Sequence, residues 1–253
     1  MIERKQAALS SEDVQTIENV LDDVGVPCHT RSALLKRAAL GVLAAGSLGA
    51  IAESAFGMAS ADSVASVVTT AVTAEALAVT YLTGVITELG DKDPVKQFLP
   101  VLKAANAAEY DHYKTLRSLG AKPLTTKFWA PAAALEPAGV FPTIEAAETV
   151  FVNAYLVGIT VFSKAGKHDL ARYAGEILGT EAEHRALARL AQGKLPNNRA
   201  FESYALKTTA QHVAELEKLG IGFGKQGSKP GTFVRFAPPP ASALTMVEGP
   251  APS

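Results

Sequence analysis

A Glu-x-x-His spacing occurs twice in this 253-residue chain, at Glu109 with His112 and at Glu181 with His184. Residues three apart lie on one face of a helix, so each copy presents a carboxylate and an imidazole in the same direction. Apolar positions recur around both copies with helical period, which predicts that both pairs point into the protein interior. One such pair is most often solvated on a helix surface, but two copies on separate helices indicate a metal site.

A helical segment with one glutamate in its apolar stripe precedes each copy, at nearly the same distance. Glu75 precedes the first copy and Glu148 precedes the second. An unpaired charge in an apolar stripe is costly to bury, so each glutamate is expected to have a cationic partner. The chain therefore consists of two similar helical hairpins. Glu145 lies one turn before Glu148 on the same face, and the choice between them stays open at this point.

A glutamate from each of two helices, with Glu-x-x-His from each of two others, is the ligand pattern of di-iron and di-manganese carboxylate proteins with the ferritin-like fold. The chain resembles this superfamily over about residues 62–195, and it is most similar to the bacterial and plant ferritin-like domains that include desiccation-related proteins. The resemblance implies a dinuclear iron cofactor, with manganese as the second choice. The implied metal ligands are Glu75, Glu109, His112, Glu148, Glu181 and His184.

The composition of the implied site suits two hard divalent cations. Four carboxylates and two neutral imidazoles supply about four negative charges, which would repel one another without bound cations. Oxygen ligands with some nitrogen favour iron or manganese over copper, and Cys28, the only cysteine, excludes a site built on cysteine pairs. Tyrosines at 81, 110, 113, 155 and 173 are candidates to place a phenol near the metals, although each is more often a core residue.

The resemblance implies that metal ions and oxygen or peroxide are the partners. It also implies that the protein is a ferroxidase-like oxidoreductase, which oxidises Fe(II) and thereby protects the cell under stress. Two alternatives remain. The first is a non-catalytic structural or desiccation-protective bundle, and the second is a di-iron oxygenase acting on an organic substrate. With 24 basic and 25 acidic residues, the chain gives no electrostatic reason to expect nucleic acid as a partner. A homodimer is left open.

Alanine-rich segments of helical period predict an all-α fold, and the resemblance makes it a ferritin-like four-helix bundle with a long crossover between helices 2 and 3. Asp62 is the expected cap of the first helix, and the proline-rich residues 121–142 are the expected crossover. A fifth, C-terminal helix is expected to pack outside the bundle. The five helices are predicted at residues 62–88, 93–119, 143–164, 169–192 and 198–219.

The chain is expected to have three parts: an N-terminal extension over 1–61, the helical bundle over 62–219 and a Gly/Pro-rich C-terminal tail over 220–253. Within the tail, Thr232 to Phe236 is a candidate short strand that docks on the bundle. His168, His212 and Glu183 are expected to lie at the surface.

The N-terminal extension contains a segment similar to an export signal. Basic residues precede an apolar run from Ala38 to Ala52, and small residues follow it. The segment resembles a twin-arginine signal in which Ser32 replaces the second arginine. The run of about 15 residues is shorter than the roughly 20 that span a bilayer, so no stable transmembrane anchor is expected. Export to the periplasm or cell surface is predicted, with a cytoplasmic location as the alternative.

Overall fold

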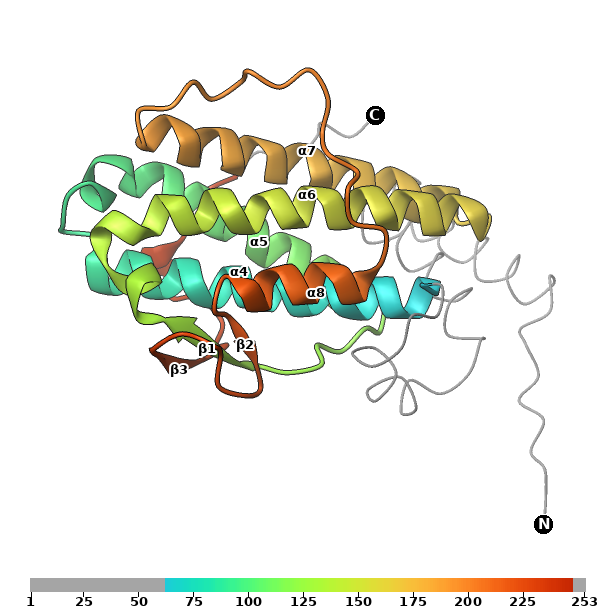
Figure 1. The fold of residues 1–253 in the computed structure, drawn as a ribbon, viewed down its shortest axis with the longest axis horizontal. Helices are drawn as coiled ribbons and strands as arrows, with labels where there is room; N and C mark the ends of the chain where they lie inside the picture. The colour runs from blue at the N-terminus through green and yellow to red at the C-terminus, as the bar shows by residue number, and fades with distance from the viewer. Residues whose placement is uncertain (1–61, 248–253) are drawn as a thin grey trace, which may run out of the picture.

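The computed structural model describes residues 62–247, and this part of the chain is mostly helical (Figure 1). The segment predicted to be an export signal lies outside the described residues. The helices are α4 Val64–Leu89, α5 Leu99–Ser118, α6 Val140–Lys164, α7 His168–Ala191 and α8 Thr209–Lys218. The strands are β1 Lys127–Pro131, β2 Gly222–Phe223 and β3 Gly231–Arg235.

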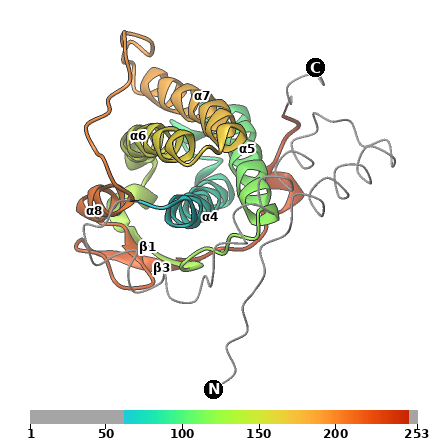
Figure 2. The same ribbon diagram turned by 90° about the vertical axis from the view of Figure 1, so that its right-hand side faces the viewer.

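The four long helices lie lengthwise beside one another around a common interior (Figures 1 and 2). α4 packs against α5, α6 packs against α7, and α4 and α6 join the two pairs. Short connections make each pair antiparallel, with Gly166 in the left-handed conformation (φ 69°) at the turn between α6 and α7. The chain between α5 and α6 runs back along the helices (Figure 1), as expected for residues 121–142.

The first helix is capped by Ser63 and not by the predicted residue, Asp62. The side chain of Ser63 accepts a hydrogen bond from the backbone N–H of Ser66, and the Ser66 side chain accepts one from the backbone N–H of Ser63. This reciprocal pair satisfies two of the N–H groups that a helix start leaves free. Asp62 instead accepts hydrogen bonds from the backbone N–H and the hydroxyl of Thr209, at 2.8 and 2.6 Å. The start of α8 is thereby fixed to the start of α4.

The prediction of a fifth helix from residue 198 is wrong over its first half, because residues 198–208 are not helical. Thr208 is the true N-cap of α8 and forms a capping box with Gln211. The shorter shift in α5, from the predicted residue 93 to Leu99, has a local cause, since a 3-10 helix from Val95 to Phe98 precedes it.

A small three-stranded sheet is the feature that the predicted all-α fold left out. β1 comes from the crossover and is the central strand, while β2 and β3 come from the C-terminal segment and pair with it antiparallel. The strand expected near Thr232 to Phe236 is present as β3. Phe128 of β1 is fully buried beneath the sheet, in a cluster with side chains of α4, α6 and α8. The sheet holds both the crossover and the C-terminal segment against the helices.

Within residues 62–247, two helical stretches, Val64–Leu89 and Pro137–Lys164, are long and apolar enough to cross a membrane. Buried residues make up 61% and 50% of their most apolar windows, and each stretch carries a buried glutamate, Glu75 or Glu148. Core helices of a folded domain pass the same test of length and composition, so the test gives only weak evidence for a span.

Candidate metal centre

All six residues predicted as ligands lie in the interior between the four long helices. α4 and α5 contribute Glu75, Glu109 and His112, and α6 and α7 contribute the other three. Helical period explains this placement, because each side chain lies on the stripe that also carries the apolar core residues of its helix. The exposed fractions are Glu75 1%, Glu109 0%, His112 7%, Glu148 4%, Glu181 0% and His184 8%.

The six side chains form two overlapping groups, each with four potential ligand atoms within 4.8 Å of one another. Two residues, Glu109 and Glu181, belong to both groups. One group is completed by Glu75 and His112, and the other is completed by Glu148 and His184. Each group thus combines one glutamate of its own, one histidine and two shared carboxylates. Each group could hold a metal ion.

Each shared carboxylate directs one oxygen to each histidine. Glu181 places Oε1 3.4 Å from His112 Nδ1 and Oε2 3.1 Å from His184 Nδ1. Glu109 places Oε2 3.7 Å from His112 Nδ1 and Oε1 2.9 Å from His184 Nδ1. Both histidines therefore use Nδ1 toward the cluster. A carboxylate whose two oxygens face two separate groups has the geometry of a bridging ligand.

The outer glutamates lie near one histidine each. Glu75 Oε2 is 3.6 Å from His112 Nδ1, and Glu148 Oε1 is 3.7 Å from His184 Nδ1. These distances are too long for hydrogen bonds. They leave room for a cation between the carboxylate and the imidazole, because metal bonds to oxygen or nitrogen are about 2.0–2.2 Å long and two such bonds span this separation.

The cluster contains an excess of acceptor atoms over donors. Six of its atoms are buried and lack a hydrogen bond of normal geometry among the described residues, whereas buried polar groups in proteins are nearly always bonded. These atoms are Glu75 Oε2, Glu109 Oε1 and Oε2, His112 Nδ1, Glu148 Oε2 and Glu181 Oε1. Unpartnered carboxylate oxygens in a dry interior are the atoms that a hard cation would satisfy, so the residues fit a metal site.

Without a cation, protons must supply the positive charge of this pocket. Burial, together with repulsion from Glu109 and Glu181, raises the pKa of Glu75 and of Glu148 well above the ordinary value. Burial also raises the pKa of Glu109, but the imidazoles beside it outweigh burial and hold that pKa well below its usual range. Burial lowers the pKa of His112, but the surrounding carboxylates outweigh burial and raise it.

Tyr155 is a tyrosine that touches the cluster. Its hydroxyl donates a hydrogen bond to Glu75 Oε1 from the neighbouring helix α6, and both side chains are buried. Burial and the negative charge of Glu75 raise the pKa of this phenol, so it stays protonated as a donor. Tyr81 donates instead to the backbone carbonyl of Ala134. The sequence named both as candidates and could not choose between them.

Glu148 and not Glu145 faces the cluster. Glu145 accepts hydrogen bonds from Arg189 and from Lys194, at 2.6 and 2.5 Å, and these cations lower its pKa although burial opposes the shift. Glu183 and His168 are exposed, as expected.

The expectation that His212 lies at the surface is wrong. Its side chain is 2% exposed, and Nε2 is 2.8 Å from Asn153 Oδ1. Asn153 in turn donates to the carbonyl of Ser203, so the pair links α8, α6 and the chain before α8. Burial lowers the pKa of His212 to about 4, which keeps the ring neutral. Arg185 on α7 is likewise buried and forms an ion pair with Glu202, a contact that the sequence analysis missed.

Comparisons with protein-family models, with curated proteins and with solved structures each find no match for this chain. The geometry and chemistry of the cluster show a buried group of glutamate and histidine side chains able to hold a metal ion.

Proposed function

We propose that this protein is a ferritin-like four-helix bundle with a dinuclear iron site that oxidises Fe(II). The observation that carries the proposal is the sharing of Glu109 and Glu181 between two four-ligand groups. A site for a single cation has no need of a second glutamate and a second histidine placed symmetrically about the shared carboxylates. Manganese fits the same ligand set and is the alternative metal.

The six residues would hold the two metal ions, and a tyrosine would orient one of the carboxylates. Glu109 and Glu181 would bridge, while Glu75 with His112 and Glu148 with His184 would each hold one ion. When bound, two Fe(II) supply two electrons, which with two protons reduce dioxygen to hydrogen peroxide, or hydrogen peroxide to two waters, leaving two Fe(III). Carboxylates can change between terminal and bridging modes, which lets one pocket hold both oxidation states. Tyr155 would keep Glu75 oriented during that change.

Stress protection follows from the chemistry if the reaction operates in the cell. Oxidation of Fe(II) removes free ferrous iron, and the electrons consume oxygen or peroxide. Oxidative damage and drying are conditions in which both removals protect other molecules. The role is thus an extension of the proposed site and depends on it.

Anaerobic titration with Fe(II), followed by exposure to oxygen, tests this function. The expected result is binding of about two Fe(II) per chain and a coloured ferric product after oxygen is admitted. The variant His112→Ala with His184→Ala should bind less iron and lose the product. His168→Ala, which changes an exposed histidine of the same helix as His184, is the matched control and should behave as the parent chain.

The protective bundle without chemistry is the second candidate, and it makes the opposite prediction. It requires that the parent chain bind no stoichiometric iron, and that the helix content and thermal midpoint stay unchanged with or without metal. The five buried carboxylate oxygens without a hydrogen bond of normal geometry argue against it, because a purely structural core gains nothing from unsatisfied carboxylates.

A further inference from the structure

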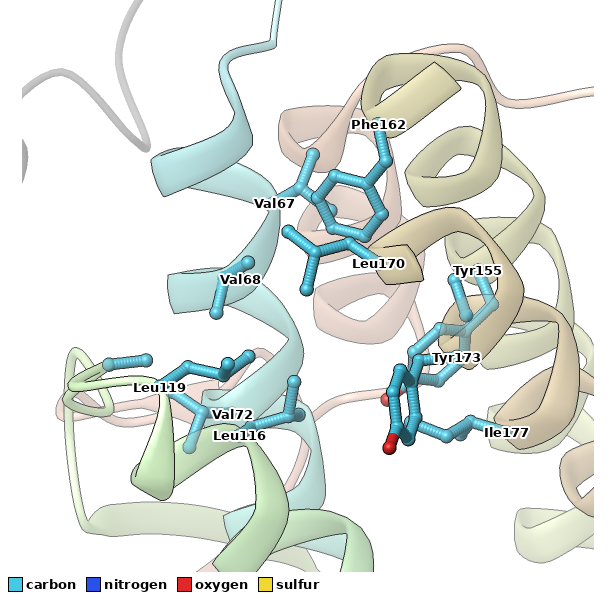
Figure 3. Packing of buried hydrophobic residues seen from close by; sticks show 12 residues of the cluster. Val67, Val68, Val72, Leu116, Leu119, Tyr155, Phe162, Leu170, Tyr173 and Ile177 are labelled. Carbon is cyan, nitrogen blue, oxygen red and sulfur yellow. The ribbon is translucent and has the colours of Figure 1, made fainter. Parts of the chain in front are cut away.

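An apolar cavity of about 60 Å³ lies between the four long helices and α8. Figure 3 shows its surroundings, with Val68 and Leu116 of α4 and α5 facing Tyr173 and Ile177 of α7. The remaining wall is mainly valine, leucine, alanine and phenylalanine. The cavity therefore offers a small, dry and almost entirely hydrocarbon space.

The cavity occupies the layer of the core directly next to the metal cluster. On each of the four helices, a lining residue stands one turn from a cluster residue. These residues are Ala71 before Glu75, Leu116 after His112, Phe151 after Glu148 and Ile177 before Glu181. Because the pairs are antiparallel, all four displacements point toward the same end of the bundle. One turn of three or four residues corresponds to about 4.5–6 Å along the helix axes.

Tyr155 connects the two spaces. Its side chain lines the cavity, and its hydroxyl donates to Glu75 in the cluster. Two threonines of the wall are already bonded to protein: Thr73 donates to the Thr69 carbonyl and accepts from the backbone N–H of Leu124, and Thr209 donates to Asp62. His212 also lines the wall, and its Nδ1 has no hydrogen-bond partner among the described residues, so it offers one partner to a water. An ordered water needs about two to four polar partners, so these walls favour an apolar occupant over water.

We infer that this cavity holds dioxygen beside the proposed metal site, so that dioxygen, and not peroxide, reaches the metals through it. The inference rests on the proposed function. Hydrogen peroxide is polar and would lose its hydrogen bonds to water on entering such a space, whereas dioxygen has none to lose. The cavity is also small for an organic substrate, because the apolar cavity that binds benzene in another protein has about 150 Å³ and this one is less than half as large.

A second cavity of about 60 Å³ lies between α4, α6 and the small sheet and is a useful comparison. Glu148 lines it together with Ala78 and Tyr81, so a cluster carboxylate forms part of its wall. A buried carboxylate attracts water or a cation more readily than a nonpolar gas. The first cavity is therefore the better gas site.

Xenon tests occupancy without any metal. Crystals of the full chain under xenon pressure should show xenon between Leu116, Tyr155 and Ile177. Ala174→Leu, which fills the cavity from α7, should abolish that peak, and Ala174→Val should weaken it if the leucine variant does not fold. A parent crystal with no xenon in this cavity would overturn the inference.

Oxidation rates test the route. With Fe(II) bound, Ala174→Leu should slow oxidation by dioxygen about tenfold and leave oxidation by hydrogen peroxide unchanged. Two control variants should slow oxidation by neither oxidant: Ala104→Leu, on α5 and away from the cavity, and Ala78→Leu, in the second cavity. Equal slowing with both oxidants, no slowing, or slowing by Ala78→Leu alone would overturn the inference. If the parent chain oxidises no iron with either oxidant, the proposed function and the route fail together, and xenon still decides the gas site.

Discussion

Tyr155 of α6 donates its hydroxyl to Oε1 of Glu75 on α4, and this contact joins the two helix hairpins at the cluster. The bond uses one oxygen of Glu75 and leaves the other, Oε2, free beside His112. A carboxylate held in this way is oriented before a metal arrives. The phenol is thus a positioning residue for one of the two proposed metal sites.

Replacing Tyr155 by phenylalanine should weaken metal binding about tenfold, because the loss of such an outer hydrogen bond typically costs ten- to a hundredfold in affinity. Anaerobic calorimetry with Mn(II) measures the change, and only the site of Glu75 and His112 should be affected. Tyr204→Phe, which changes a tyrosine that is 39% exposed and lies before α8, provides the control. Equal affinities in parent and Tyr155→Phe would show that the phenol does not orient Glu75.

Glu148 and Glu145 offer a matched pair one turn apart on α6. Glu148→Gln removes a charged ligand from the site of His184, so metal stoichiometry should fall from about two per chain to about one under limiting metal. Glu145→Gln should leave two metals bound but lower the free energy of unfolding by about 1 kcal/mol, since it breaks the ion pairs with Arg189 and Lys194. Chemical denaturation and metal analysis separate the two effects, and reversed outcomes would exchange the roles of the two glutamates.

Metal affinity should rise with pH. The pKa values of Glu75, Glu148, His112 and His184 are all raised without metal, so each of these groups binds a proton that a cation must displace. About two protons would be released per metal, so affinity should increase by up to about a hundredfold per pH unit where these groups titrate. Titrations in buffers of different ionisation enthalpy count the released protons. An affinity independent of pH would contradict a site built from these residues.

His212 predicts an acid-sensitive contribution to stability. Its pKa falls from 6.5 to about 4 on folding, so between these values the unfolded chain binds more protons than the folded chain. The contribution is complete above pH 6.5 and is lost as pH falls toward 4, by about 3 kcal/mol in total. Urea denaturation of the parent and His212→Gln across this range isolates the histidine, because the cluster titrates alike in both. Parallel stability curves would contradict the prediction.

Local sequence patterns account for much of this site. The apolar stripes around Glu75 and Glu148 and the two Glu-x-x-His spacings sufficed to name the residues that the fold brings together. Helical period fixes which side chains share a face, and the two hairpins repeat the same order. The choice of Tyr155 among five tyrosines could not be made in this way, because it depends on which helix faces α4.

The errors lie where distant segments meet. β1 forms because strands about a hundred residues further along the chain pair with it. The sequence of Lys127–Pro131 does not indicate those partner strands. The sequence predicted Asp62 as a helix cap, but its carboxylate accepts a hydrogen bond from the backbone N–H of Thr209 at the start of α8. His212 was expected at the surface from the sequence. Its burial costs less because Nε2 forms a hydrogen bond with Asn153 of α6.

Anomalous scattering from crystals soaked in Mn(II) shows directly whether the cluster binds two ions. We expect two manganese peaks about 3.5–4 Å apart between the four long helices. Glu109 and Glu181 should touch both peaks, Glu75 and His112 one of them, and Glu148 and His184 the other. A single peak, or none within reach of these six side chains at saturating Mn(II), would contradict the dinuclear site.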